Sequence, residues 1–434
     1  MSEQDKLLAA EMAAVSAVKS TEIVAAASSA GELNAYQNKL DDSLDRVMDA
    51  QKTLQNLEAY EVTPEVAYEV DRSLTKAGVE IPVAEGHESV VGAESLGISL
   101  MPKDYLMTRL MGCESFLGDF YKNSREVVQR IGASFKDSYV IFTESQESLS
   151  KSLDLLENLV DTHPDFASVE SFILEHRLYN LFKVNGKVSQ DWVGNLTKLS
   201  STIGGLSTNY FLNSKNVLQS TFSYFGGFAG LDQVSADDRI TQLPISIPSI
   251  PFKECTYPNN RHGGPNLVAK QSVELMGGAY FYDVRQKERA KQATNVDEVK
   301  DFLIRYQEFD GTGFENTDEY TFKELGAEIR SLSSKEIKAV IKLLRGVLKD
   351  WAKVFENAEK FKLLDNDYND VIKGFLETDI SEETKTLLAK WFSSIVRKNQ
   401  MELLVIRASV SNYLTLIING LIDVCNNSIK VNAP

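Results

Sequence analysis

The sequence has few cysteines and histidines and lacks the motifs of the common enzyme classes. Its three cysteines, Cys113, Cys255 and Cys425, lie far apart and form no CxxC pair. An odd number cannot complete a disulfide framework, so we expect buried thiols in a reducing compartment. No GxxxxGK[ST], GxGxxG, HExxH or GxSxG motif occurs, which excludes the usual phosphate-binding loops, zinc protease sites and nucleophile elbows. We therefore expect no enzyme, no cofactor and no metal.

A secretory signal and a membrane span are also missing. The first residues, Met-Ser-Glu-Gln-Asp, contain neither a basic region nor an apolar core, so we expect cytoplasmic synthesis without export. The uncharged run 408–422 contains five Ser, Thr and Asn residues and falls short of the roughly 20 apolar residues that a membrane span needs. We interpret this run as part of a buried helix.

The remaining candidates for chemistry are weak. The four histidines, His87, His163, His176 and His262, are isolated from one another in the sequence. The DGTG segment at 310–313 does not place carboxylates at the spacing of a calcium loop, so a surface turn is expected. Gly277 and Gly278 suggest a strand bend. Arg261 and His262 could bind an anion or, with Cys255, form an unfamiliar enzyme site, but a plain glycine turn is the simpler interpretation.

Negative charge is concentrated at the N-terminus. Residues 1–94 contain 7 Lys+Arg and 18 Asp+Glu, a net charge of -11, whereas the remaining 340 residues contain 39 and 44, a net charge of -5. An acidic segment repels nucleic acid, and a nearly neutral body does so much less. The alternative is that the acidic helices serve solubility alone.

The first 78 residues are predicted to form a helical, acidic arm that stands apart from the main fold. Ser2 and Asp5 resemble a capping box, and a single apolar stripe from Leu33 to Leu57 predicts a helix over 32–60 that needs a partner helix. Thr63, Pro64 and Gly78 frame a third, short helix. A linker is expected at 79–100, where no helical stripe occurs.

The fold class is predicted to be mainly α, with long amphipathic helices forming a bundle-like body that contains a small β-rich insert. A helical region is expected at 101–235, with helices near 116–135 and 149–159 and a turn at 222–230. Residues 236–290 form the predicted β-rich insert. A C-terminal helical region follows at 291–434, in which Ser333 and Glu336 form a capping box and another long helix starts at Glu382.

One tripeptide in the linker carries a resemblance to a known family. Gly92-Ala93-Glu94, followed by Ser95, fits a pattern of a small residue, any residue and Glu. The chain resembles the internal head, or inner-body, proteins of large-headed tailed bacteriophages. This resemblance implies an N-terminal propeptide that directs the protein into the assembling prohead, and a prohead protease that cuts after Glu94. Gly86-His87-Glu88 is the alternative cleavage site.

The same pattern ends at Glu eight times in residues 1–94 and nine times in the remaining 340. The linker matches lie where helix signals lapse, and a protease needs an extended, exposed substrate. The resemblance therefore implies a virion structural protein inside the capsid, matured after Glu94 and ejected with the DNA. Its partners would be the prohead protease, prohead core or capsid proteins, packaged DNA by proximity, and further copies in a homo-oligomer, with no membrane contact. The alternative is an unprocessed, non-enzymatic scaffold or adaptor that binds partners through the acidic arm.

Overall fold

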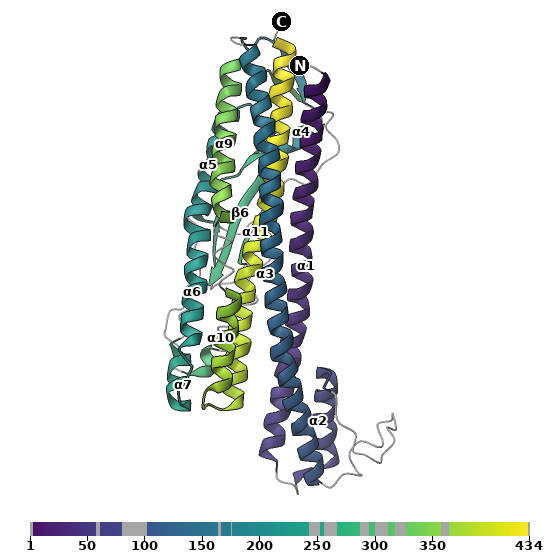
Figure 1. Cartoon of the computed structure of the whole chain (residues 1–434), viewed down its shortest axis with the longest axis vertical. Helices are drawn as coiled ribbons and strands as arrows, with labels where there is room; N and C mark the ends of the chain where they lie inside the picture. The colour runs from purple at the N-terminus through teal and green to yellow at the C-terminus, as the bar shows by residue number, and fades with distance from the viewer. Residues whose placement is uncertain are drawn as a thin grey trace, which may run out of the picture.

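Three long helices form the central part of an elongated bundle in the computed structural model (Figure 1). They are α1 (Glu3–Asn56), α3 (Pro102–Thr162) and α11 (Glu382–Asn432). At 1.5 Å per residue, α3 is about 90 Å long. The structure describes residues 3–57, 61–79, 102–163, 166–174, 176–242, 252–255, 267–286, 295–299, 311–316, 327–356 and 364–432. Both termini lie at one end of the bundle, and α2 (Pro64–Ala77) lies at the other end.

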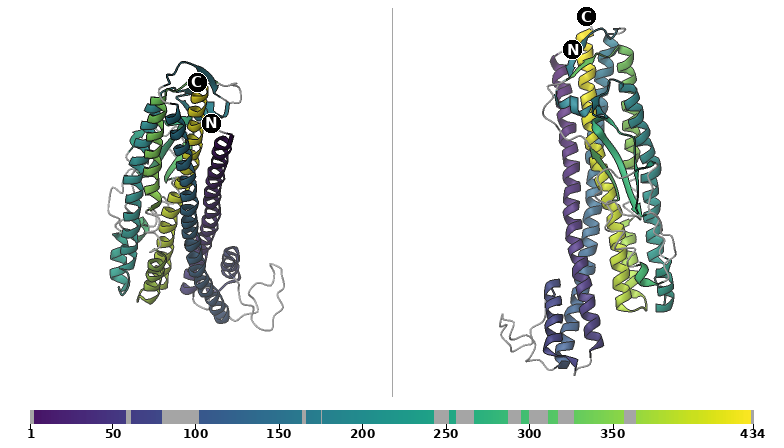
Figure 2. Two further views of the ribbon diagram at one scale, coloured as in Figure 1. Left: turned by 45° about the horizontal axis from the view of Figure 1, so that its top comes forward. Right: turned by 180° about the vertical axis from the view of Figure 1, so that it is seen from behind.

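Helix α1 runs antiparallel to both α3 and α11 and packs beside them in every view (Figure 2). Lys19 of α1 pairs with Glu144 of α3, and further down the bundle Gln37 of α1 is hydrogen-bonded to Ser124 of α3. Asp45 of α1 pairs with Lys390 of α11. The sequence led us to expect an arm that stands apart from the main fold, and this expectation was wrong for α1. The physical reason is that the apolar stripe of α1 finds its partner helices within the same chain.

A second layer of helices covers the other side of α3 and α11. Helix α9 (Ser334–Glu356) buries its apolar stripe against both, and Trp351 Nε1 donates to Ser411 Oγ at 3.1 Å. The predicted capping box is confirmed, because the Ser333 backbone N donates to Glu336 Oε2 at 2.8 Å and the Glu336 backbone N to Ser333 Oγ at 3.4 Å. The other helices of this layer are α5 (Trp192–Gly205), the π-helical turn η2 (Leu206–Phe211), α6 (Leu212–Gly226), α7 (Gln233–Thr241) and α10 (Leu364–Glu377), and the short helix α4 (His176–Leu181) contacts α11 and the turn Met276–Gly278.

A four-stranded antiparallel sheet lies against α11, with strand order β4-β5-β6-β7. The Tyr413 hydroxyl of α11 donates to the carbonyl oxygen of Met276 at 2.9 Å, and its ring lies 5.0 Å from that of Phe314. Two short strand pairs, β1 with β8 and β2 with β3, complete the β structure of the described residues. The strands are β1 (Ser171–Leu174), β2 (Lys183–Val184), β3 (Lys187–Val188), β4 (Lys253–Cys255), β5 (Leu267–Gln271), β6 (Ala279–Gln286), β7 (Gly311–Asn316) and β8 (Ala327–Arg330).

The mainly α fold with a small β insert is confirmed, and several predicted boundaries need correction. The separate helices expected within the first 60 residues are the single helix α1, and the two expected over 116–159 are the single helix α3. Residues 222–226 continue helix α6, and the turn occupies only 227–230. Gly311–Gly313, expected in a surface turn, belong to β7 and pair with β6. In these cases, helix packing or strand pairing with another part of the chain outweighs the effect of local glycine and other helix-breaking residues.

Helix α11 is the one described helix that is long and apolar enough to cross a membrane, by length and composition. Its most apolar stretch is 67% buried within the protein, among α1, α3, α9 and the sheet. A core helix passes the same test, and the burial agrees with our interpretation of residues 408–422 as part of a buried helix.

Candidate functional site: the interface of the N-terminal segment

The contact between the N-terminal helices and the rest of the chain is the candidate functional site, because the predicted cleavage would separate these two parts. We call residues 3–79 the N-terminal segment and the described residues from 102 onward the body. We call the end of the bundle at α2 the tip. Helix α2 begins as the sequence predicts, with Thr63 Oγ1 accepting from the backbone N of Val66 at 3.4 Å. It ends at Gly78, whose φ of 79° is left-handed.

The tip has its own small core. The side chains of α1 and α2 meet the first turns of α3 there, and Tyr105 and Cys113 of α3 are almost completely buried between them. Burial raises the pKa of the Cys113 thiol to about 11. The buried residues of this tip cluster are Val47, Ala50, Leu54, Ala67, Val70, Leu74, Ala77, Val79, Tyr105 and Cys113.

A buried ion pair crosses the interface in the tip. Arg109 Nε and Nη2 donate to the two carboxylate oxygens of Asp71 at 2.9 and 3.0 Å. The Tyr105 hydroxyl lies 3.0 Å from Asp71 Oδ1 and 3.1 Å from the carbonyl oxygen of Ala67. The Arg109 guanidinium also lies 4.7 Å from the centre of the Tyr105 ring. Burial and the negative charge of Asp71 raise the pKa of Tyr105, so the tyrosine stays protonated as a donor.

A second buried ion pair crosses the interface near the middle of the bundle. Arg397 Nη2 on α11 donates to Asp41 Oδ2 at 2.8 Å and to Asn38 Oδ1 at 3.0 Å. Gln37 Nε2 connects this pair to α3, because it lies 3.0 Å from Asp41 Oδ1 and 2.7 Å from Ser124 Oγ. Asp41 is 5% exposed and Arg397 is 3% exposed. Asp41 and Asn38 both belong to α1, so the N-terminal segment supplies the carboxylate that balances the charge of Arg397.

The sequence did not single out these four charged residues. The signal was present, since Asp71 lies one residue after Val70 and three before Leu74, on the apolar face of α2. Asp41 likewise lies three residues before Leu44 on the stripe of α1. A charge on an apolar helix face predicts a buried partner of opposite sign. Which arginine supplies that partner depends on tertiary packing.

The predicted cleavage residues lie outside the described residues. They belong to 80–101, between Val79 at the end of the N-terminal segment and Pro102 at the start of α3. The cleavage site therefore stays a prediction. Its residues are Gly92, Ala93, Glu94 and Ser95, with Gly86, His87 and Glu88 as the alternative.

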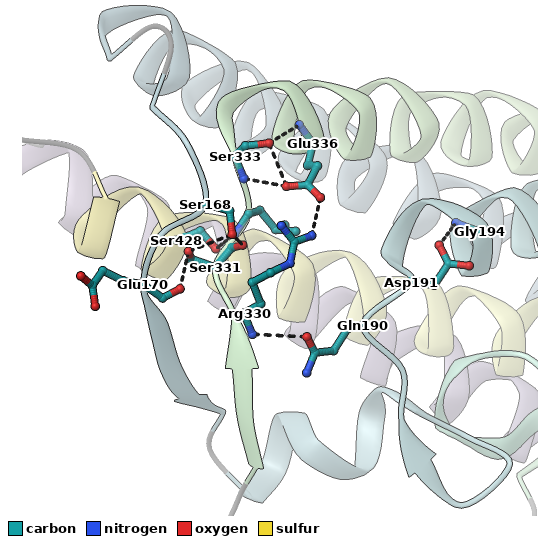
Figure 3. A network of polar contacts seen from close by, with 11 residues as sticks. Ser168, Glu170, Gln190, Asp191, Gly194, Arg330, Ser331, Ser333, Glu336 and Ser428 are labelled. Atoms are coloured by element: carbon teal, nitrogen blue, oxygen red, sulfur yellow. Dashed lines mark hydrogen bonds and ion pairs between the residues drawn. The ribbon is translucent and has the colours of Figure 1, made fainter.

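Among the described matches outside the helices, Ser168-Val169-Glu170 is hydrogen-bonded to segments distant in the sequence (Figure 3). The Glu170 carbonyl oxygen accepts from the backbone N of Ser331 at 3.0 Å and from its Oγ at 2.6 Å. The backbone N groups of Val169 and Glu170 donate to Asn432 Oδ1 at 3.1 and 3.2 Å. Ser168 Oγ donates to the Ser331 carbonyl oxygen at 2.5 Å. The backbone of Val169 and Glu170 is therefore hydrogen-bonded both to Ser331 and to Asn432.

The weaker candidates from the sequence do not form a site among the described residues. Arg261 and His262 lie outside them, and only the backbone of Cys255 is described, in β4. Gly277 and Gly278 have φ of 74° and 65° and belong to a 3-10 turn, Met276–Gly278, that leads into β6, so they form a turn before the strand and not a bend within it. In the part of the chain that the structure describes, no group of three or more His, Cys, Asp or Glu residues could hold a metal ion.

These features define the class: an elongated helical-bundle protein in which the N-terminal helices are built into the body through two buried ion pairs. The sequence pattern of one family, described as phiKZ-like phage internal head proteins, matches residues 12–427. The chain belongs to this family. It is a structural protein of the phage head interior, and the match covers both the N-terminal segment and the body. No match was found to a curated protein sequence or to a solved structure.

Proposed function

We propose that this internal head protein is made as a precursor and is cut after Glu94 by the prohead protease once it is inside the assembling head. The observation that carries the proposal is the Gly92-Ala93-Glu94 tripeptide between the end of α2 and the start of α3. A cut there would separate residues 1–94 from a body that begins with Ser95. A cut after Glu88 is the second choice.

The fold supports this choice of site by protecting competing matches. A protease binds its substrate as an extended strand, and a helix must unwind before it can be cut. Matches to the pattern end within α1, α2 and α3, where the backbone is helical. The match at Glu170 is held by Ser331 and Asn432. The matches in these three helices end at Glu11, Glu22, Glu32, Glu69, Glu114, Glu126 and Glu147, and two more end in the first turns of α9 and α11, at Glu336 and Glu383.

The uneven charge suggests what the cut achieves. It divides a chain of net charge -16 into parts of -11 and -5. Before the cut, the acidic segment keeps the precursor away from nucleic acid and is available to prohead core or capsid proteins. After the cut the segment is no longer covalently attached, and a body from which it is displaced repels packed DNA less strongly and tolerates proximity to the genome. The body acts as a packing component without catalysis or cofactor, and it leaves the head with the DNA at infection.

Substitution of the cleavage residue tests the proposal. We expect Glu94→Gln to abolish conversion to the shorter chain, because the protease requires the carboxylate of that residue. The measurement is the intact mass of the protein from phage particles assembled with each variant. Glu85→Gln is the matched control, since it removes an equal charge from the same stretch without altering any match to the pattern.

Conversion of the Glu94→Gln chain at the normal position would disprove cleavage after Glu94. If the chain is instead cut after Glu88, the N-terminal segment is still a propeptide, but the cleavage site is Gly86-His87-Glu88. If neither variant nor the natural chain is ever shortened, the second candidate function, an unprocessed scaffold or adaptor, is favoured.

A further inference from the structure

We propose that a cut between residues 79 and 102 does not release the N-terminal segment, which stays bound to α3 and α11 as a second, non-covalent chain. The inference rests on the proposed cleavage and concerns the product of that cut. The interaction surface is the face of α3 and α11 that α1 and α2 cover. Its occupant is residues 3–79 of this chain.

The apolar contacts of the segment extend from Ile23 to Val79. Ile23, Ala27 and Ala30 join the main hydrophobic core of the body. Further down, Leu44 packs with Leu117 and Phe120 of α3. The tip cluster then adds eight more buried apolar residues from the segment. None of these contacts depends on the peptide bond after Glu94, so the cut alone removes none of them.

The two buried ion pairs hold the segment at two well-separated points. Asp71 engages Arg109 near the start of α3, and Asp41 engages Arg397 on α11. Each pair joins the segment to a different helix of the body. A segment that slid along its groove would break both pairs, so together they fix its register.

The body would expose apolar surface if the segment departed. Leu117 and Phe120 are 7% and 1% exposed, and Cys113 is fully buried, while all three lie on α3 beneath the segment. A helix that exposes such a face is prone to association. The bound segment therefore keeps the cut protein soluble, and its acidic charge leaves the body only where something displaces it.

A cut made without the phage protease tests this directly. We would replace residues 86–95 of the full-length chain with the recognition sequence of an unrelated, sequence-specific protease and cut the purified protein. Size-exclusion chromatography and native mass spectrometry then report whether the fragment stays. We expect one fragment per body in a single species with the mass of the uncut chain plus one water.

Cysteine alkylation gives an independent readout. Cys113 lies beneath the segment, whereas Cys425 lies in the main core, and both are fully buried. We expect the alkylation rate of both thiols to be the same before and after the cut. If the fragment elutes alone, or Cys113 becomes reactive while Cys425 stays protected, the proposal is wrong.

Paired variants test which contacts hold the segment. Asp41→Asn with Asp71→Asn neutralises the two buried carboxylates, and we expect the fragment to leave the cut chain about tenfold faster or more. Asp42→Asn with Glu69→Gln makes the same charge change at exposed positions of the same helices and should have little effect. Equal loss from both double variants would show that the buried pairs do not hold the segment.

The failure of this proposal and the failure of the proposed function give different results. The added protease cuts an engineered site, so fragment retention is measured whether or not the phage protease cuts after Glu94. Conversely, the start of the chain in phage particles reports the natural cut regardless of what the fragment does afterwards.

Discussion

At the scale of single residues, buried charges carry the most specific information about this protein. Asp71 and Arg109 are 2% and 6% exposed, so the dehydration of each charge is offset only by its partner and by Tyr105. Removing one member leaves the other charge buried without compensation, which typically costs 3–5 kcal/mol. The pair therefore makes the position of α2 on α3 specific.

We expect Asp71→Ala to destabilise the tip by about 3 kcal/mol, because Arg109 would keep its buried position without a carboxylate. Hydrogen exchange of the amides of α2 measures this as a lower free energy of opening. Glu69→Ala is the control, since the Glu69 side chain is 67% exposed and contacts Arg72 of the same helix. Similar losses from both variants would show that the buried pair does not stabilise the tip.

At the scale of elements, helix ends were read well from the sequence and helix continuity was not. Thr63, Gly78, Ser333 and Glu336 were each assigned a capping role, and the structure places them in it. Capping depends on residues within one turn, so local sequence contains the necessary information. Whether α3 continues past its glycines depends on α1, α9 and α11, which are distant in the sequence.

The cap of α9 gives a test at this scale. We expect Ser333→Ala to reduce stability by about 1 kcal/mol, because the backbone N of Glu336 loses its acceptor. Thermal unfolding followed by circular dichroism measures the change. Ser150→Ala, at an exposed position inside α3, is the control and should be neutral or slightly stabilising. An equal effect at Ser150 would contradict a specific role of the cap.

Strands were the elements that the sequence predicted least completely. The insert at 236–290 contains β4, β5 and β6, but their partner β7 lies beyond it at Gly311–Asn316. The pairing of β1 with β8 joins Ser171–Leu174 to Ala327–Arg330, across more than 150 residues. Such short strands have little periodicity of their own, and their existence depends on a partner that one sequence does not identify.

At the scale of the whole molecule, the N-terminal segment is acidic in sequence but integral in structure. The charge difference between residues 1–94 and the rest correctly marks a chemically distinct part of the chain. The charge difference does not mark an independent arm. Most charged residues lie on the exposed face of α1, whereas the opposite face packs on α3 and α11. A segment can therefore be cut from the chain and still be part of the core, provided that maturation begins with a cut and not with unfolding.

The most direct test of the central claim is the N-terminus of the protein in purified phage particles, obtained by N-terminal sequencing together with intact mass. We predict a body that starts at Ser95. An uncut chain that starts at Met1 or Ser2 and continues past Glu94 in mature particles would contradict maturation after Glu94, whereas a separate fragment that ends at Glu94 would not.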